Sequence, residues 1–468
     1  MRLSLSTRAL LILASLNLLD YLDRYLIAAL GTLVKKDFGL TEQSFGFLGT
    51  AFFLVYFLSS PVFGYLGDRW GRIRMMAGGA ALWSLATSLT FWVVSYPTLV
   101  LARGLVGVGE ASFGTLAPAY LADILPLNRR SRALGLFYVA LPVGSALAYL
   151  VGGLVGSRWG WRPAFLVAGL PGLLIAALVY RLPGGDEEQR IGRGDQGSET
   201  PAPSPKPSPP TPYRGLGGEF EGRAGELRSP GPPLNSTSPT SPWTAAWRLW
   251  SIPTLRWVSL GYGMFTFTLG GLAFWMPTYL ETAKGLSLEQ SNYLLFGSVT
   301  LAGGLGTLVG GLLGDRLLSY TPRAPLWVSG LGAALALPLA GLVIFSPLAF
   351  LYIPALAGAV FLLFLNPGVL TAVVVSVAGR ARRALAVALN IVIIHLVGDV
   401  PSPFLIGWAA DRWGLKWGVT LTLVALAVGV MLIFAALPHL VRDLANVGEL
   451  SDRDGSDGGS IYPDKLED

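Results

Sequence analysis

The sequence predicts an all-α membrane protein with twelve transmembrane helices in two groups of six. The chain has 468 residues, of which 52% are hydrophobic and only 13% are charged, and its mean hydropathy is +0.56. Soluble proteins of this length are far more polar. Apolar runs long enough to cross a bilayer recur about a dozen times, and a polar stretch divides them into two groups.

Loops and turns bound the predicted spans along the whole chain. The spans lie near residues 9–34, 44–66, 75–95, 98–122, 132–156, 162–182, 254–280, 289–313, 325–346, 349–375, 383–408 and 416–438. The first run carries charges and lacks a small-residue cleavage site, so we expect a retained span and not a signal peptide. We divide the chain into an N-terminal six-helix bundle, a cytoplasmic linker, a C-terminal six-helix bundle and a polar cytoplasmic tail, at residues 1–182, 183–250, 251–440 and 441–468.

The linker and the basic loops predict the topology. The linker is rich in Pro, Gly, Ser and charged residues, and such a segment cannot bury a core, so we expect it to be largely disordered. Three basic clusters fall in predicted loops on the linker's side of the membrane: Arg69, Arg72 and Arg74; Arg129, Arg130 and Arg132; Arg380, Arg382 and Arg383. The positive-inside rule therefore places both termini and the linker in the cytoplasm. The Ala-, Gly- and Arg-rich composition favours a bacterial inner membrane.

The composition also excludes other classes of protein. The chain has no Cys and two His, which excludes disulfides, thiolate metal sites and His-rich metal sites. The net charge of +6 lies mostly in loops and the linker, so it indicates topology and not nucleic-acid binding. No nucleotide-binding loop or nucleophile–base pair is present, so we expect neither an enzyme nor an ATP-driven pump, and no cofactor. An ion gradient would then drive transport, and protons are the simplest choice because carboxylates are available.

Three charged residues interrupt the first predicted span. Asp20, Asp23 and Arg24 stand in N-L-L-D-Y-L-D-R-Y at residues 17–25. Each charge within the membrane costs about 2.5–3.5 kcal/mol on an insertion scale, while a Leu, Ile or Val returns about 0.3–0.6 kcal/mol. This helix must therefore face protein or a wet cavity. The charges are either an ion pair that locks helices together or an ion- or proton-handling site, and we favour the second interpretation.

The fourth predicted span carries a second pair of charges. Arg103 and Glu110 stand seven residues apart in R-G-L-V-G-V-G-E, on one face of a helix, and Glu110 lies near the membrane midplane. Gly107 leaves a smooth face for close helix packing. Arg103 and Glu110 are either buried structural partners, or Glu110 is the carboxylate whose protonation gates a transport cycle or the partner of Arg24.

A loop motif occurs once in each half. The loop after the second span reads G-Y-L-G-D-R-W-G-R-I-R from Gly64 to Arg74, and a weaker copy, G-L-L-G-D-R, runs from Gly311 to Arg316. The repeat at equivalent positions favours a conformational latch over a simple basic loop that only sets topology. The expected latch residues are Gly64, Asp68, Arg69, Arg72, Gly311, Asp315 and Arg316.

The second half is poor in buried charge. Tyr262 and Phe265 belong to an aromatic seventh span, and Asn366 before Pro367 indicates a break in the tenth span that faces the cavity. His395 and Asp399 are spaced to hydrogen-bond on one helix, as a satisfied buried pair or as a second titratable or headgroup site. One wall of the cavity would thus be charged and the other largely apolar, which suits an amphipathic molecule with an anionic head.

The loop motif from Gly64 to Arg74 resembles the loop 2–3 motif of the major facilitator superfamily. The internal repeat and the linker fit that superfamily across almost the whole chain. The resemblance implies the major facilitator superfamily fold, with two pseudo-symmetric six-helix bundles around a central cavity. It also implies alternating access, with spans 1, 4, 7 and 10 lining the cavity.

Further stretches resemble the Spinster family, whose members export sphingosine phosphate or lysophospholipids. They are Y-L-D-R-Y at 21–25, F-G-Y-L-G-D-R at 63–69, R-G-L-V-G-V-G-E-A-S-F-G-T-L-A-P at 103–118 and L-P-V-G-S-A-L-A-Y at 141–149. The family's charged positions in spans 1 and 4 match Asp23, Arg24 and Glu110 here. The family usually has Asn where this chain has Asp20, so the coupling carboxylate is ambiguous.

We therefore predict a monomeric secondary transporter of an amphipathic lipid-like substrate, coupled to protons and surrounded by membrane lipids. Expected proton-coupling residues are Asp20, Asp23 and Glu110; expected substrate contacts are Arg24, Glu110, Tyr25, Tyr262, Phe265, Asn366 and His395; expected structural residues are Arg103, Gly107 and Asp399. The alternatives are a proton-coupled transporter of a small organic anion or drug, and a non-transporting membrane receptor.

Overall fold

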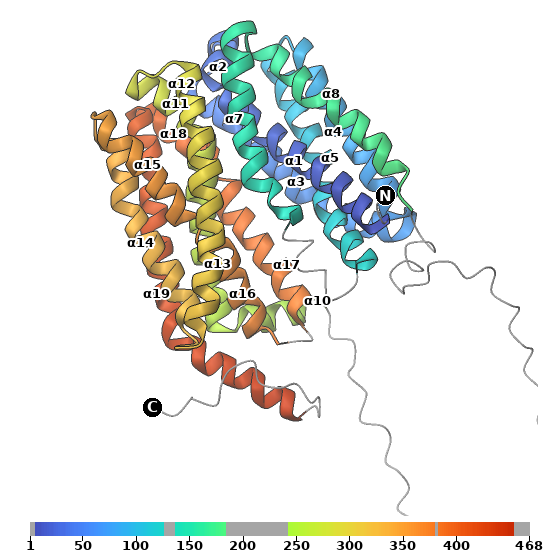
Figure 1. Ribbon diagram of the computed structural model, residues 1–468, viewed down its shortest axis with the longest axis vertical. Helices are drawn as coiled ribbons and strands as arrows, with labels where there is room; N and C mark the ends of the chain where they lie inside the picture. Colours follow the sequence, from blue (N-terminus) through green and yellow to red (C-terminus); the bar gives the residue numbers. More distant parts are fainter. Residues whose placement is uncertain (1–4, 126–135, 184–241, 380–381, 454–468) are drawn as a thin grey trace, which may run out of the picture.

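The computed structural model describes residues 5–125, 136–183, 242–379 and 382–453, and this part of the chain is helical with no strand. Figure 1 shows long helices running side by side, with α10 lying across them at one end. The N-terminal half contains α1 Leu5–Ala29, α2 Gly31–Phe38, α3 Glu42–Trp70, α4 Arg72–Leu89, α5 Tyr96–Ile124, α7 Ala140–Trp159 and α8 Trp161–Tyr180. The C-terminal half contains α10 Pro242–Trp250, α11 Pro253–Lys284, α12 Leu288–Gly297, α13 Gly304–Leu318, α14 Ala324–Phe345, α15 Ala349–Leu363, α16 Asn366–Val377, α17 Arg383–Ile394, α18 Ser402–Trp413 and α19 Leu415–Arg453.

Each half forms its own bundle. In the first half α4 packs between α5 and α8, and in the second half α11 packs against α19. Eleven of the described helical segments are long and apolar enough to cross a membrane. With α4, whose first turn carries Arg72 and Arg74, each half has six long helical segments in the described part. This arrangement agrees with the predicted pattern of six spans, a linker and six spans, while residues 184–241 of that linker lie outside the described residues.

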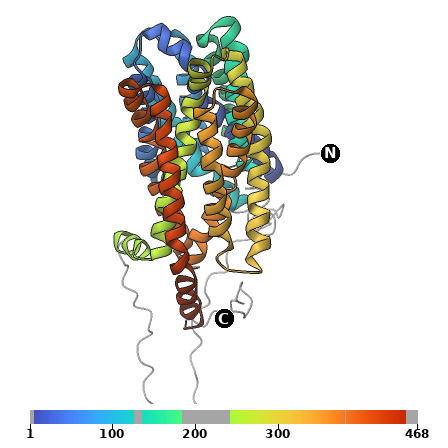
Figure 2. The same ribbon diagram turned by 90° about the vertical axis from the view of Figure 1, so that its left-hand side faces the viewer.

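The two halves meet at one end of the molecule, which we call the closed end and which is marked by α2 in Figure 1. Helix α3 packs on α18, and α7 packs on α12. A hydroxyl hydrogen bond runs from Thr50 to the carbonyl oxygen of Val400 at 2.7 Å, and another runs from Tyr149 to that of Ala273 at 2.9 Å. The opposite end, where α10 lies, is called the α10 end; Figure 2 shows α10 and the last turns of α19 there.

Several predicted spans are interrupted in the structure. The first ends at Ala29, and the short helix α2 follows it. The predicted break at Asn366 is confirmed, because α15 ends at Leu363 and α16 begins at Asn366. Between α17 and α18 lies a π-helical segment, His395–Asp399. Such segments are frequent at functional sites, because the wider turn redirects side chains.

Helix α19 continues past the predicted boundary at residue 440 and ends at Arg453, so the start of the expected polar tail is helical. Asp443 joins this part of α19 to α11. Its carboxylate is buried and accepts a hydrogen bond from the backbone N–H of Thr254 at 3.0 Å, in the first turn of α11. The tail of one helix therefore satisfies a free backbone donor at the start of another. The end of the predicted linker also differs, since residues 242–250 form α10.

Replacing Asp443 with Ala should lower the free energy of unfolding by about 1–2 kcal/mol, because it leaves the Thr254 N–H without an acceptor. The midpoint of heat unfolding in detergent measures this. The matched control is Arg442→Ala, since Arg442 is 63% exposed and its Nε lies 3.7 Å from Asp443. Solvent screens the exposed guanidinium of Arg442, which does not come within hydrogen-bond distance of Asp443, so this control should stay near wild type. Equal losses in both variants would contradict the capping role.

Candidate transport site

The first-span charges meet the fourth-span carboxylate inside the N-terminal half. Asp20 and Arg24 are one helical turn apart on α1, and Glu110 lies at the middle of α5. Arg24 Nη2 donates to Asp20 Oδ2 at 2.9 Å and to Glu110 Oε2 at 2.9 Å. Arg24 Nε also donates to Glu110 Oε2 at 3.2 Å. The predicted partnership of Glu110 with Arg24 is thus present in the structure.

Aromatic rings surround the shared guanidinium. The Cζ atom of Arg24 lies 4.7 Å from the ring centroid of Tyr21, 5.3 Å from that of Phe52 and 5.2 Å from that of Tyr56. Rings at these distances attract a cation through their quadrupoles. Gly107 permits this packing, because a Cβ there would lie 2.6 Å from the carbonyl oxygen of Phe52. The predicted close approach at Gly107 is therefore confirmed, and it brings α5 against α3.

Asp23, Thr87 and Arg103 form a second layer of the site, inside the N-terminal half. The side chain of Asp23 is buried and accepts a hydrogen bond from the Thr87 hydroxyl of α4 at 3.2 Å. One interpretation of the sequence paired Arg103 with Glu110, but these two side chains do not hydrogen-bond to each other. The Arg103 guanidinium donates instead to the backbone carbonyl oxygens of Asp23 and Arg24, at 3.4 and 3.3 Å. Arg103 therefore holds the backbone of α1 in place beside the charge cluster.

The two layers together carry unequal charge. Asp20, Asp23 and Glu110 supply three carboxylates, whereas Arg24 and Arg103 supply two guanidinium groups, so the fully ionised cluster carries one excess negative charge. One oxygen of each carboxylate has no hydrogen-bond partner among the described residues. A buried charge without compensation is costly in hydrocarbon. The cluster can remove the imbalance by taking up one proton.

The C-terminal half presents a second polar pair to this cluster. His395 Nδ1 and Asp399 Oδ2 lie 2.7 Å apart on the π-helical segment, as their spacing predicted. The His395 ring centroid is 6.3 Å from that of Tyr56, and Tyr25 of α1 is partly buried against the hydrophobic core that both halves share. Tyr56 thus lies between Arg24 in one half and His395 in the other.

The other expected substrate contacts of the second half are packed within it. Phe265 is fully buried against Gly429 of α19, which corrects the expectation of a cavity contact. Asn366 is also buried, and its side chain pairs with Ser329 of α14 and donates to the carbonyl oxygen of Leu363 at 3.0 Å, so it does not face a cavity here. Tyr262 is partly buried against the core of the same half.

The structure describes the side chains of only some of the expected latch residues. Arg72 pairs with Asp123 of α5, which links the first loop to a neighbouring helix, whereas Arg69 is exposed and donates to Tyr65 of its own helix at 3.4 Å. Arg316 is exposed. The side chains of Asp68 and Asp315 lie outside the described part of the structure.

The glycines of this motif differ in how closely a neighbouring residue approaches them. A Cβ at Gly64 would make only ordinary contact at 3.8 Å, and none would be within 4 Å at Gly311. The close approach belongs to Gly67, where a Cβ would lie 2.4 Å from the Leu116 side chain. Gly67, and not Gly64, is therefore the glycine of this helix that a neighbouring side chain approaches closely.

One residue at the closed end escaped the sequence analysis. Asp411 of α18 accepts hydrogen bonds from the backbone N–H groups of Glu42 and Gln43, at 2.8 and 2.9 Å. It therefore satisfies the free donors in the first turn of α3, across the boundary between the halves. A signal for it exists in the sequence, since D-R-W-G at 411–414 repeats D-R-W-G at 68–71.

Replacing Thr87 with Val should lower the free energy of unfolding by about 1–3 kcal/mol, because it removes the hydroxyl that donates to buried Asp23. Heat unfolding in detergent measures the change. Ser88→Ala on the same helix is the control, since the Ser88 hydroxyl donates only to the carbonyl oxygen of Ser84. In protein that also carries Asp23→Asn, Thr87→Val should lower the free energy of unfolding by less. An equal loss with and without Asp23→Asn would contradict the pairing of Thr87 with Asp23.

Known proteins share this sequence along most of its length. The family model of the Major Facilitator Superfamily matches residues 13–398. Rat protein spinster homolog 1 is 34% identical over 443 residues, which cover 88% of this chain and 74% of the rat protein. The mouse sphingosine-1-phosphate transporter SPNS2 is 31% identical over 412 residues, which cover 84% of this chain and 68% of the mouse protein.

Solved structures share the fold. A bacterial homolog of the human lysosomal transporter Spinster, in an inward-facing and unoccupied conformation, superposes with a TM-score of 0.75 at 20% identity, covering 95% of this chain and 99% of that chain. A D-xylose-proton symporter superposes with a TM-score of 0.67 at 16% identity, covering 92% and 97%. At these identities the superpositions show the fold alone. The chain belongs to the major facilitator superfamily and, within it, to the Spinster family of multi-pass membrane transporters.

Proposed function

We propose that this protein is a proton-coupled transporter of an amphipathic, lipid-like substrate of the lysophospholipid or sphingosine-phosphate type, working by alternating access. The observation that carries the proposal is the shared guanidinium of Arg24, bonded to Asp20 and Glu110 beside the boundary of the two halves. The side chain of Glu110 is 0% exposed, whereas that of Arg24 is 11% exposed.

The charge balance supports protons as the coupling ion. The ionised cluster has one negative charge in excess, so one proton makes it neutral. Asp20 and Glu110 share the same nitrogen of Arg24, and each has one oxygen without a hydrogen-bond partner among the described residues. Protonation of either acid therefore weakens its ion pair and changes which contacts Arg24 can make. Asp23 fits the role less well in this conformation, because it is buried in the second layer and hydrogen-bonded to Thr87.

An anionic headgroup would use the same guanidinium. Arg binds phosphate through two parallel hydrogen bonds, but both carboxylates occupy it here. A phosphate can replace Glu110 on Arg24 without adding net charge only if Glu110 takes up a proton. Binding of the substrate and binding of the proton are then favourable together, and the affinity for an anionic substrate rises as the pH falls.

The surroundings of Arg24 support an amphipathic substrate over a purely polar one. The rings of Tyr21, Phe52 and Tyr56 lie close to the guanidinium. The facing half contributes the pair His395 and Asp399, together with apolar residues such as Phe267 in the hydrophobic core that both halves share. Relatives with the printed names protein spinster homolog 1 and sphingosine-1-phosphate transporter support the same substrate class.

Alternating access is supported by the one-sided contact between the halves. Most of the contacts that join them in the described part lie toward the closed end, where α3 meets α18 and α7 meets α12. Asp411 strengthens this closure through backbone donors of α3, and the bonds from Thr50 and Tyr149 also end on backbone carbonyl oxygens. Such contacts can be exchanged for water when the closed end opens.

Transport into liposomes tests the substrate and the coupling together. We expect flux of lysophosphatidylglycerol or sphingosine phosphate, stimulated by a pH gradient, and no flux of a sugar or a small organic anion. Arg24→Ala should reduce flux at least about tenfold, since a hydrogen bond to a charged group contributes about 1.5–3 kcal/mol. Glu110→Gln should bind the lipid with an affinity that no longer depends on pH, because the amide mimics the protonated acid.

Controls for this experiment use a charged pair elsewhere in the same half. Asp37→Asn removes a pair between Asp37 and Arg162 at 2.6 Å, outside the cluster, and should leave the pH dependence unchanged. Unchanged pH dependence in Glu110→Gln and in Asp20→Asn would contradict proton coupling through this cluster. Lipid binding without flux would support the receptor alternative. Flux of the small organic anion alone would contradict a lipid-like substrate and support the alternative transporter.

Replacing Asp411 with Ala should loosen the closed end, because the N–H groups of Glu42 and Gln43 lose their acceptor. The chain has no Cys, so Ala273→Cys provides a single thiol beside the contact with Tyr149. Alkylation of that thiol by a membrane-impermeant maleimide should become several-fold faster when Asp411→Ala is added. Asp37→Ala, an acid at the same end bonded within one half, is the control. An unchanged rate would contradict the role of Asp411.

A further inference from the structure

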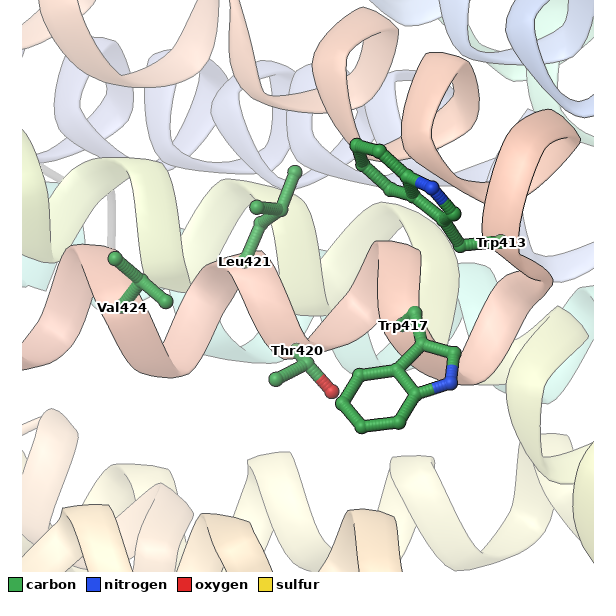
Figure 3. Close-up of a pocket in the computed structure, with 5 residues that line it drawn as sticks. All are labelled: Trp413, Trp417, Thr420, Leu421 and Val424. Atoms are coloured by element: carbon green, nitrogen blue, oxygen red, sulfur yellow. The ribbon is translucent and has the colours of Figure 1, made fainter.

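A groove on the outer wall of the C-terminal half is lined almost wholly by apolar side chains. It has a volume of about 350 Å³ and is formed by Trp413 of α18 and by Trp417, Thr420, Leu421 and Val424 of α19. Figure 3 shows Trp413 and Trp417 at one end of the groove and Val424 at the other. Trp413, Trp417 and Val424 are more than half exposed, so this groove is separate from the charge cluster at the centre of the molecule.

The groove runs in the direction that a bilayer lipid would take. Trp417 stands in the first turn of α19, at the closed end, and Val424 is seven residues further along the helix. Seven residues of α-helix span about 10 Å. Tryptophans are enriched where hydrocarbon meets the headgroups, so the Trp end marks the interface and the Val424 end lies deeper in the hydrocarbon.

Two cations stand at the Trp end. Arg412 stacks on Trp408 at 4.1 Å, and the Trp408 ring packs edge-on against Trp413 at 5.6 Å. On the other side, Lys416 lies 4.8 Å from the ring of Phe345, which packs against Trp417 at 6.1 Å. Cation–aromatic contacts therefore hold both positive groups beside the mouth of the groove.

No carboxylate among the described residues pairs with either cation. Lys416 has no hydrogen-bond acceptor for its ammonium group in the described part, and Arg412 uses one of its five donors, on the carbonyl oxygen of Trp408 at 3.2 Å. The nearest acid along the chain, Asp411, accepts from the backbone of α3 with both oxygens. The mouth of the groove is thus positively charged, and its floor is apolar.

We propose that this groove is a binding site for one anionic phospholipid of the surrounding membrane, with its phosphate between Arg412 and Lys416 and one acyl chain along α19 toward Val424. Charge complementarity at the mouth selects the anionic headgroup, and the apolar floor holds the chain. The site is distinct from the transport site, and a lipid there would brace the turn between α18 and α19 at Gly414, next to the closed end.

Native mass spectrometry of the full-length protein tests the proposal. The probes are phosphatidylglycerol and phosphatidylcholine with identical acyl chains, each added at the same concentration to delipidated protein in detergent. We expect one phosphatidylglycerol to be retained in preference to phosphatidylcholine. The double variant Arg412→Gln/Lys416→Gln should weaken that preference by about 10- to 30-fold, given the usual contribution of a basic residue near an anionic lipid.

Two matched variants make the result specific. Lys36→Gln/Arg158→Gln removes two exposed positive charges from the closed end of the other half and should leave the preference intact. Val424→Trp fills the deep end of the groove without changing charge, and should reduce retention several-fold even if the charge variant fails to fold.

Three outcomes would overturn the proposal. Equal retention of the two lipids, unaffected by either groove variant, would mean that ordinary annular lipid covers this surface. Full competition by glycerol phosphate, with no effect of Val424→Trp, would mean a phosphate site without an acyl-chain site. A dimer that Val424→Trp dissociates would mean that a second copy of the chain occupies the groove.

Discussion

The sharing of one guanidinium between carboxylates of two helices is the interaction on which the site depends. Arg24 cannot stay charged inside a membrane without its partners, and neither Asp20 nor Glu110 can stay ionised without Arg24. This mutual dependence brings α1 and α5 together at the middle of the N-terminal half. It also makes the cluster responsive, because a proton or an anion that changes one contact alters the balance of the others.

Within this one group of charges, some residues fix α1 in place and others face the other half. Arg103 and Thr87 bond to Asp23 and to the backbone of α1, well inside the N-terminal half, and so fix the helix that carries Arg24. The outer layer, with Arg24, faces the other half across Tyr56, which lies beside His395 of the π-helical segment. A rigid inner layer beneath an adjustable outer layer is suited to a site that must change its contacts without unfolding the bundle.

Two further features, the contacts between the halves and the apolar groove, lie near each other at the closed end. At the closed end the halves are joined by bonds to backbone groups and by two carboxylates, Asp411 on the backbone of α3 and Glu281 on the hydroxyl of Thr32. The groove beside Trp413 and Trp417 lies on the same α18–α19 turn, so the proposed lipid and the contact of Asp411 with α3 would act on neighbouring residues. Membrane composition could thereby influence the closure through a site that the substrate does not use.

The sequence by itself determined the fold class, the number of long helices, the division into two halves and the residues of the central cluster. Apolar runs and charges within them are local properties that the bilayer constrains strongly, so Asp20, Arg24 and Glu110, and the pair His395 and Asp399, could be named in advance. Only the tertiary structure decided which side of a helix meets which neighbour. In the structure Phe265 and Asn366 are core residues, and Arg103 donates to backbone carbonyl oxygens. Asp443 of α19 accepts a hydrogen bond from α11, and Asp411 of α18 accepts one from α3. These contacts join residues distant in the chain, and an apolar sequence restricts helix rotation too weakly to predict them.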